Sequence, residues 1–147
     1  MMKNIYLLNG PNLNLLGTRE PEKYGSLSYE DLIKSLKIYL SNKGFTLKAY
    51  QSNQEGELID LLHTAHKDEE CIGVVINPGG YTHTSVSLRD AILAIDKNVV
   101  EVHITNPSER EDFRKKNLIS DIVSSSIVGE GTEGYFKALD LLLSNEK

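Results

Sequence analysis

Residues 71–80, CIGVVINPGG, decide the fold of this chain. Residues 71–76 form the most continuous apolar run in the sequence, a pattern typical of a central parallel strand that is covered on both faces. Asn77-Pro78-Gly79-Gly80 then ends the strand, because proline and glycine interrupt regular structure. A strand of this kind needs other strands beside it and helices above and below it, so the rest of the chain should supply both.

Four further apolar segments have the length of strands. They are residues 5–8, 45–50, 99–104 and 126–128. Between them lie apolar residues at helical spacing. The first such stripe follows Ser28, a predicted N-cap with Asp31 at the capping-box position, and ends before Gly44. The four stripes are Leu32, Ile33, Leu36 and Leu40; Leu58, Leu61, Leu62 and Ala65; Leu88, Ala91, Ile92 and Ile95; and Tyr135, Phe136, Leu139, Leu142 and Leu143.

Strands that alternate with helices predict a parallel sheet built by right-handed crossovers. At this length we expect a three-layer, flavodoxin-like, doubly wound α/β fold with five strands in the order 2-1-3-4-5. The chain of 147 residues is too short for two ordinary domains, so residues 1–147 are predicted to form one.

Composition excludes several classes of function. The formal net charge is −5, which argues against an electrostatic grip on nucleic acid or an anionic membrane. A single cysteine permits no internal disulfide and no multi-cysteine metal site. The N-terminal apolar run is too short for a secretory signal, and no stretch approaches the roughly 20 apolar residues of a membrane helix. We therefore expect a soluble, cytoplasmic protein.

In doubly wound folds, ligands bind at the carboxyl ends of the strands. The segments that follow the five predicted strands are residues 9–14, 51–53, 77–83, 103–106 and 129–131. Together they are rich in amides, hydroxyls and glycines, and they include a histidine at a strand end, His103. They hold no carboxylate pair, metal-ligand cluster or nucleophile motif, so the predicted site is polar and free of metal.

Several side chains near this edge are candidates for chemistry. His103 ends a predicted strand, whereas His83 could contact substrate or cap a helix. Arg110 and Arg114 are four residues apart, a spacing that would place them on one side of a helical turn and that suits a carboxylate clamp. A solvated pair is the alternative interpretation of these arginines.

The connection 9–26 is longer than most and is a candidate lid. It carries Tyr24, whose phenol would need a lowered pKa to act as a base, since an unperturbed phenol has a pKa of about 10. A guanidinium within about 4–6 Å can lower that value by roughly 1–3 units, and Arg19 is the local candidate.

Other motifs favour structural roles. Residues 129–134 match the dinucleotide fingerprint GxGxxG, but that motif follows a first strand, so a turn into the last helix is the better interpretation. His63 and His66 are three residues apart without an evident third metal ligand, which favours a solvated helix face. Cys71 opens a buried strand and is predicted to be a core residue.

These segments together resemble the type II 3-dehydroquinate dehydratase family over nearly the whole chain. The carriers are residues 8–17, LNGPNLNLLG; 19–25, with REP and YG; 51–56, QSN with EG; 76–83, INPGGYTH; 101–103, EVH, with Arg110 and Phe113-Arg114; and the turn 129–135. The resemblance implies anti elimination of water from 3-dehydroquinate through an enolate, in the shikimate pathway, with no Schiff base, metal or cofactor.

The resemblance also implies roles for individual residues. Tyr24 would be the base, kept ionised by Arg19, and His103 would be the general acid, oriented by Glu101. Asn12 and Asn77 would support the enolate, the latter through a water. The positions that match substrate-binding residues of the family are His83, Asp90, Ile104, Thr105, Arg110 and Arg114. Asp90 would reach the site of a neighbouring subunit, and the family assembles as a dodecamer, a tetrahedral arrangement of trimers.

Three other classes of protein compete with this interpretation. A flavin-binding electron carrier of this fold would need a Ser/Thr-rich phosphate loop after the first strand, where this chain has Asn9-Gly10-Pro11-Asn12. A receiver-type signalling module would need clustered aspartates there and at the end of the third strand, where Asn77 stands. A metabolite binder that has lost catalysis is disfavoured because Arg19, Tyr24 and His103 are all present.

Overall fold

The computed structural model describes residues 2–18 and 27–146. Its core is a five-stranded parallel sheet in the order β2-β1-β3-β4-β5, which confirms the predicted fold. The strands are β1 (Asn4–Asn9), β2 (Thr46–Gln51), β3 (Cys71–Asn77), β4 (Val99–His103) and β5 (Ser125–Val128). The described helices are α2 (Tyr29–Ser41), α3 (Glu55–Lys67), α4 (Val86–Ala94) and α5 (Glu133–Ser144). Four 3₁₀ turns lie between them: η1 (Leu13–Leu15), η2 (Gly79–His83), η3 (Pro107–Glu109) and η4 (Asp112–Lys115).

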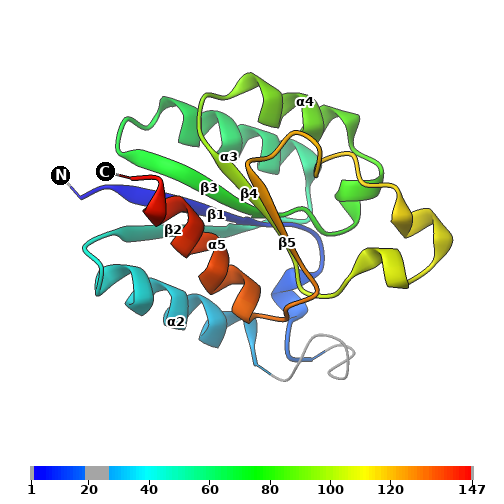
Figure 1. The fold of residues 1–147 in the computed structure, drawn as a ribbon, viewed down its shortest axis with the longest axis horizontal. Helices are drawn as coiled ribbons and strands as arrows, with labels where there is room; N and C mark the ends of the chain where they lie inside the picture. The colour runs from blue at the N-terminus through cyan, green and yellow to red at the C-terminus, as the bar shows by residue number, and fades with distance from the viewer. Residues whose placement is uncertain (1, 19–26, 147) are drawn as a thin grey trace.

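The helices cover both faces of the sheet (Figure 1). α2 and α5 pack on one face, around a core that includes Leu36 and Leu139, and α3 and α4 pack on the other, around Leu62 and Leu88. β1 and β3 are buried along almost their whole length, as their continuous apolar runs predict. The result is the expected three-layer arrangement.

Side-chain caps fix where two of the helices begin. The Ser28 hydroxyl accepts a hydrogen bond from the Asp31 N–H at 3.1 Å, which confirms the predicted N-cap of α2. The Ser85 hydroxyl accepts from the Leu88 N–H at 2.8 Å and starts α4 in the same way. The cap at Ser85 sets the direction in which α4 leaves the carboxyl edge of the sheet.

The turns after β1 and β3 are in direct contact at this edge. The Gly10 N–H donates to the Asn77 carbonyl at 2.8 Å, and a Cβ at Gly10 would lie only 2.5 Å from the Pro78 carbonyl oxygen. Glycine is therefore required for this close approach, which brings the two central turns together at the switch point of the sheet.

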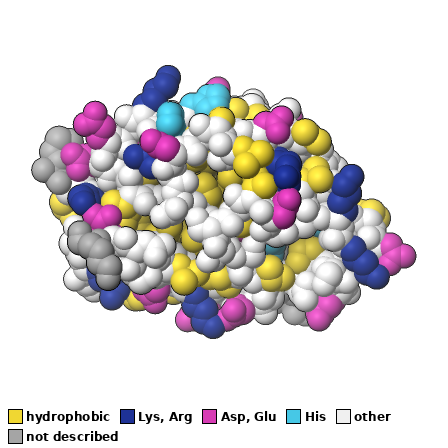
Figure 2. Space-filling view, turned by 45° about the horizontal axis from the view of Figure 1, so that its top comes forward, with side chains coloured by type: hydrophobic (Ala, Val, Ile, Leu, Met, Phe, Trp, Pro, Cys, Tyr) yellow, Lys and Arg dark blue, Asp and Glu magenta, His cyan; other side chains and the backbone are white. Residues whose placement is uncertain are grey.

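Charges of both signs are interspersed on the molecular face that Figure 2 shows, in keeping with a net charge of −5. The two termini lie near each other at the amino edge of the sheet, where Lys3 and Glu146 form an ion pair. Among the described residues, no helix has the length and apolar character needed to cross a bilayer.

Candidate active site

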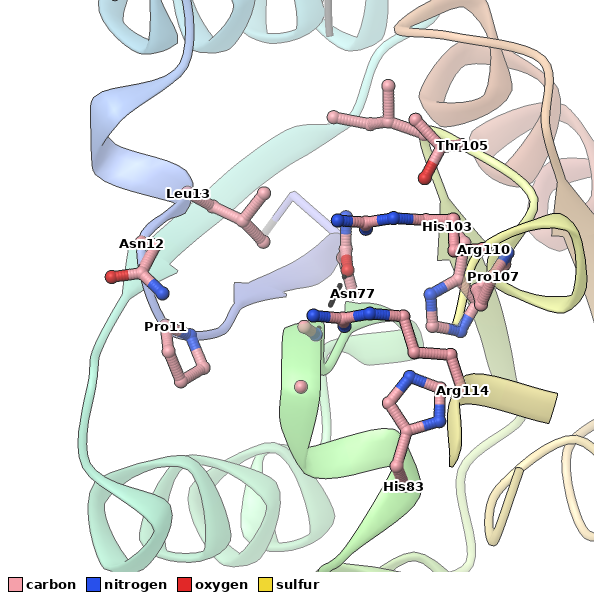
Figure 3. Close-up of a pocket in the computed structure, with 13 residues that line it drawn as sticks. Pro11, Asn12, Leu13, Asn77, His83, His103, Thr105, Pro107, Arg110 and Arg114 are labelled. Carbon is pink, nitrogen blue, oxygen red and sulfur yellow. Dashed lines mark hydrogen bonds between the residues drawn. The ribbon is translucent and has the colours of Figure 1, made fainter. Parts of the chain in front are cut away.

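A polar pocket of about 160 Å³ opens at the carboxyl edge of the sheet, at the position predicted from the fold (Figure 3). The turns after β1 and β3 form one side of it, and the end of β4 with the arginine-bearing segment forms the other. It is lined by Pro11, Asn12, Leu13, Asn77, Gly79, Gly80, His83, His103, Ile104, Thr105, Pro107, Arg110 and Arg114. Most of the site residues expected from the sequence thus share one cavity.

A buried histidine–carboxylate pair lies at the end of β4. His103 Nε2 is 2.6 Å from Glu101 Oε2, and the two residues are 6% and 0% exposed. They are two positions apart on one strand, so their side chains leave the same face of the sheet. Because an ionised carboxylate only accepts hydrogen bonds, the ring nitrogen that faces Glu101 carries the proton.

Glu101 accepts hydrogen bonds from three neighbours besides His103. The donors are Asn117 Nδ2 at 2.9 Å, Thr82 Oγ1 at 3.2 Å and Ser126 Oγ at 2.7 Å. Burial alone would raise the pKa of the Glu101 carboxyl, but the hydrogen bond and charge of His103, together with Ser126 and Asn117, bring that pKa below its usual value. The carboxylate is therefore ionised at neutral pH and can accept the hydrogen bond from the His103 ring.

Asn77, at the end of β3, is oriented by a buried network. Its Nδ2 donates to the Tyr135 hydroxyl at 2.9 Å, which in turn donates to Asn9 Oδ1 at 2.7 Å. Asn77 Oδ1 accepts from the Gly79 N–H at 3.1 Å. This network therefore fixes the Asn77 amide where it lines the pocket.

Asn12, in the turn after β1, lines the pocket in a left-handed backbone conformation, with φ of 72°. Among the described residues, Asn12 is the one non-glycine residue with a positive φ. The Asn12 N–H donates to Asn53 Oδ1 at 3.0 Å, which ties this turn to the end of β2. Asparagine tolerates this conformation better than most residues, so the sequence suits the geometry.

Three basic side chains border the pocket beside His103. His83 Nδ1 lies 2.7 Å from the Lys116 carbonyl, and the side chains of Arg110 and Arg114 point into the cavity (Figure 3). Arg114 Nε donates to Glu111 Oε1 at 2.7 Å, and the same oxygen lies 4.0 Å from Arg110 Nε. This part of the pocket is suited to a ligand carboxylate.

Arg110 and Arg114 do not lie on one helical turn. Arg114 belongs to η4, but Arg110 is the C-cap of η3, and the non-helical backbone of Arg110 and Glu111 separates the two short turns. Both arginines nevertheless line the pocket, so the clamp arises from the fold of the segment rather than from helical periodicity.

Two of the five segments expected at the site do not line it. Residues 51–53 and 129–131 follow β2 and β5, which are the edge strands, and the pocket forms over the central strands instead. Gly129 and Gly131 donate to the carbonyls of His103 and Ile104, both at 3.0 Å, and so brace the end of β4. Residues 129–134 form the expected turn into α5.

Some of the other residues that the sequence singled out lie away from the pocket, and two are not among the described residues. Asp90 is exposed on α4 and is not among the lining residues. Arg19 and Tyr24 lie outside the described residues. His63 and His66 are exposed on α3, Cys71 is buried as predicted, and the described residues contain no group of three or more His, Cys, Asp or Glu side chains that could hold a metal ion.

The residues that hold the Glu101 and Asn77 side chains in place were not predicted from the sequence. Thr82, Asn117 and Ser126 surround Glu101, and Tyr135 was predicted only as a core residue of the last helix. They come from η2, the segment after η4, β5 and α5, so no local pattern joins them. Only a buried carboxylate that needs donors could have indicated that such partners exist.

Fold and pocket define a doubly wound α/β protein with a buried histidine–carboxylate pair facing two arginines. Residues 3–143 match the family model described as dehydroquinase class II, and the chain belongs to that family.

Relatives and solved structures agree with this assignment. The chain is 48% identical over 145 residues to 3-dehydroquinate dehydratase 1 of Corynebacterium efficiens, covering 99% of this chain and 95% of that protein. It is 46% identical over 147 residues to a catabolic 3-dehydroquinase of Aspergillus clavatus, covering 100% and 97%. The crystal structure of a type II dehydroquinase from Butyrivibrio crossotus matches with a TM-score of 0.93 and 41% identity, covering 97% and 98%.

Proposed function

We propose that this protein is a 3-dehydroquinate dehydratase that removes water from 3-dehydroquinate by anti elimination through an enolate, in the shikimate pathway. The observation that carries the proposal is the buried Glu101–His103 pair at a pocket lined by Arg110 and Arg114. Family membership supplies the substrate, since the relatives are named for this reaction.

The reaction needs one base and one acid. Tyr24, held ionised by Arg19, takes the proton beside the ketone, and the C–H electron pair becomes that of the enolate. His103 then gives a proton to the leaving hydroxyl as the enolate collapses to the conjugated enone, and water departs. Tyr24 ends protonated and His103 neutral, so before the next turnover Tyr24 must release its proton to solvent and His103 must take one up from solvent.

The hydrogen-bonding groups of the pocket fit the remaining roles. Asn12 and Asn77, the latter through a water, stabilise the negative charge of the enolate. Arg110 and Arg114 hold the substrate carboxylate, while His83 and the Ile104-Thr105 strand end bind its hydroxyls. The reaction uses no metal and no cofactor.

We further propose that the enzyme works in the cytoplasm as a dodecamer, a tetrahedral arrangement of trimers. Asp90 is exposed on α4 and outside the pocket of its own chain, as expected of a residue that reaches a neighbouring site. Replacing Asp90 by Asn should then raise KM for 3-dehydroquinate, although Asp90 does not line the pocket of its own chain.

Direct assay tests the proposal. Purified, assembled protein is mixed with 3-dehydroquinate in the presence of a chelator, and the ultraviolet absorbance of the enone product is followed. A rise that the chelator does not change supports a dehydratase without a metal step. A flat trace refutes the enzyme and leaves a metabolite binder, which calorimetry with 3-dehydroquinate would detect. Tyr24→Phe should abolish turnover while it preserves binding, and full activity in that variant would exclude Tyr24 as the base.

A further inference from the structure

Asn117 contacts the site from outside the pocket and has no role in the reaction described above. Its Nδ2 donates to Glu101 Oε2 at 2.9 Å, and its Oδ1 accepts from Thr82 Oγ1 at 3.0 Å. The same Oδ1 also accepts from the backbone N–H groups of Ile119 and Ser120, at 2.8 and 2.9 Å. The amide is thus fixed at its oxygen, and its nitrogen is aimed at the carboxylate.

Asn117 is a more dependable hydrogen-bond donor to Glu101 Oε2 than Thr82 is. The Thr82 hydroxyl has one hydrogen and two acceptors within reach, Asn117 Oδ1 at 3.0 Å and Glu101 Oε2 at 3.2 Å. When that hydrogen lies toward Asn117, the shorter of the two contacts, Oε2 keeps only His103 and the Asn117 amide as donors. Ser126 serves the other carboxylate oxygen, Oε1.

The backbone around Asn117 also holds the second histidine of the pocket. The Lys116 carbonyl lies 2.7 Å from His83 Nδ1, and the Leu118 N–H donates to the Thr82 carbonyl at 2.8 Å. Residues 116–118 therefore connect η2, which carries His83, to the strand that carries His103. The position of Asn117 is set by this connection and not by the side chain alone.

The charges that face the buried pair can be named. On β4 the pair consists of Glu101 and His103 themselves, η2 contributes His83, and the segment bordering the pocket contributes Arg110 and Arg114. The neighbouring β5 contributes only the neutral Ser126 hydroxyl. In the described part of the chain, Glu101 is thus the carboxylate that contacts the His103 ring.

We propose that Asn117 is a positioning residue: its hydrogen bond keeps the Glu101 carboxylate ionised and aligned for its contact with the His103 ring. The role of His103 in turnover rests on the proposed function. The effect of Asn117 on the protonation of the Glu101–His103 pair does not depend on that function. Without the Asn117 donor, a carboxylate facing a neutral imidazole loses more stabilisation than one facing an imidazolium. The pair, which titrates as a unit, then takes up its proton more readily.

Titration of His103 by NMR tests this inference without substrate. Protein labelled at histidine Cε1 is titrated as the assembled wild type and as Asn117→Leu, and His103→Asn assigns the resonance. Because the hydrogen bond from Asn117 stabilises a charged carboxylate, and part of that stabilisation differs between the two protonation states of the pair, the His103 titration in Asn117→Leu should move to higher pH by about one pH unit. Ser126→Ala, which removes the donor to Oε1, should move it in the same direction.

Arg89→Met is the matched control. Arg89 donates to the Leu118 carbonyl at 2.8 Å and pairs with Asp121, so its loss loosens the segment after Asn117 without touching Glu101. The His103 titration should stay at its wild-type pH in this variant. An unchanged titration in Asn117→Leu would overturn the proposal, and so would an equal shift in Arg89→Met, which would indicate a merely structural role. If Asn117→Leu does not assemble, Asn117→Ala removes the donor without added bulk and replaces it.

Turnover provides the second measurement. In Asn117→Leu the alkaline limb of kcat/KM should follow the NMR shift, kcat should fall about tenfold, and KM for 3-dehydroquinate should change less than about threefold, because the arginines are untouched. A wild type that titrates as expected but does not turn over would refute the proposed function alone. An active wild type whose His103 titration is the same in all variants would refute only this inference.

Discussion

The most informative single change behind the pocket is Tyr135→Phe. The Tyr135 side chain is 1% exposed, and its hydroxyl accepts from Asn77 Nδ2 and donates to Asn9 Oδ1, at 2.9 and 2.7 Å. Phenylalanine keeps the ring and removes both bonds. Because Asn77 and Asn9 are 3% and 0% exposed, water cannot easily take the place of the hydroxyl.

The expected cost follows from the two amide groups that are left without this partner. An unsatisfied buried donor or acceptor costs about 1–3 kcal/mol, so the loss of both bonds should lower the free energy of unfolding by about 2 kcal/mol or more. A domain of this size retains enough stability to fold after such a loss. Turnover should fall as well, since the amide of Asn77 loses one of its two anchors at the pocket.

Urea unfolding measures this cost, with every variant at one protomer concentration so that the proposed assembly affects all variants equally. Tyr39→Phe is the control: the Tyr39 hydroxyl donates to Asp140 Oδ1 at 2.5 Å, but on the exposed side of α2 and α5. Its removal should change the free energy of unfolding by no more than about 0.5 kcal/mol. If the two variants lose similar stability, the buried network does not have the energetic role assigned to it.

Three further changes test other parts of the molecule. Gly10→Ala should destabilise the protein and reduce turnover, because its Cβ would lie 2.5 Å from the Pro78 carbonyl oxygen; thermal unfolding and assay would check this, and a wild-type melting temperature would contradict it. Burial would raise the pKa of the Asp68 carboxyl, but hydrogen bonds, among them one from Lys48, lower that pKa to about 2. The ionised carboxylate therefore adds about 1–2 kcal/mol to the stability of the fold above pH 4, and this contribution is lost as the pH falls toward 2. Urea midpoints of wild type and Asp68→Asn should therefore converge on acidification, and a constant difference would refute the assignment. Arg114→Ala should raise KM for 3-dehydroquinate about tenfold or more with a smaller change in kcat, and steady-state kinetics with unchanged KM would remove Arg114 from the carboxylate site.

Local patterns were sufficient to predict the architecture. The apolar run at residues 71–76 became the central strand β3, and the helical stripes became α2 to α5, because burial of apolar surface on both faces of a sheet allows few alternatives. Boundaries moved by a residue or two: β1 extends to Asn4 and Asn9, and β4 ends at His103, one residue before the predicted end. The first and last residues of a strand depend on its hydrogen bonds to neighbouring strands, and the hydrophobic periodicity of one segment carries no information about that pairing.

The pocket was predictable only in part. His103, Asn77 and Asn12 follow central strands, and the rule that ligands bind at the carboxyl edge was enough to bring them together. The same rule also selected residues 51–53 and 129–131, which lie at the flanks. The positions of Arg110 and Arg114 depend on two short turns, where no helical period applies.

The sequence by itself determined the fold class, the edge of the sheet at which the site lies and most of the side chains that line it, because hydrophobic periodicity and strand-end position are local properties. Only the tertiary structure decided which buried groups hold those side chains in place. The donors to Glu101 come from positions 82, 117 and 126, and the partner of Asn77 comes from position 135. A buried charge or amide must be satisfied, but the residue that satisfies it is fixed by how distant segments pack, and that information exists only once the chain has folded.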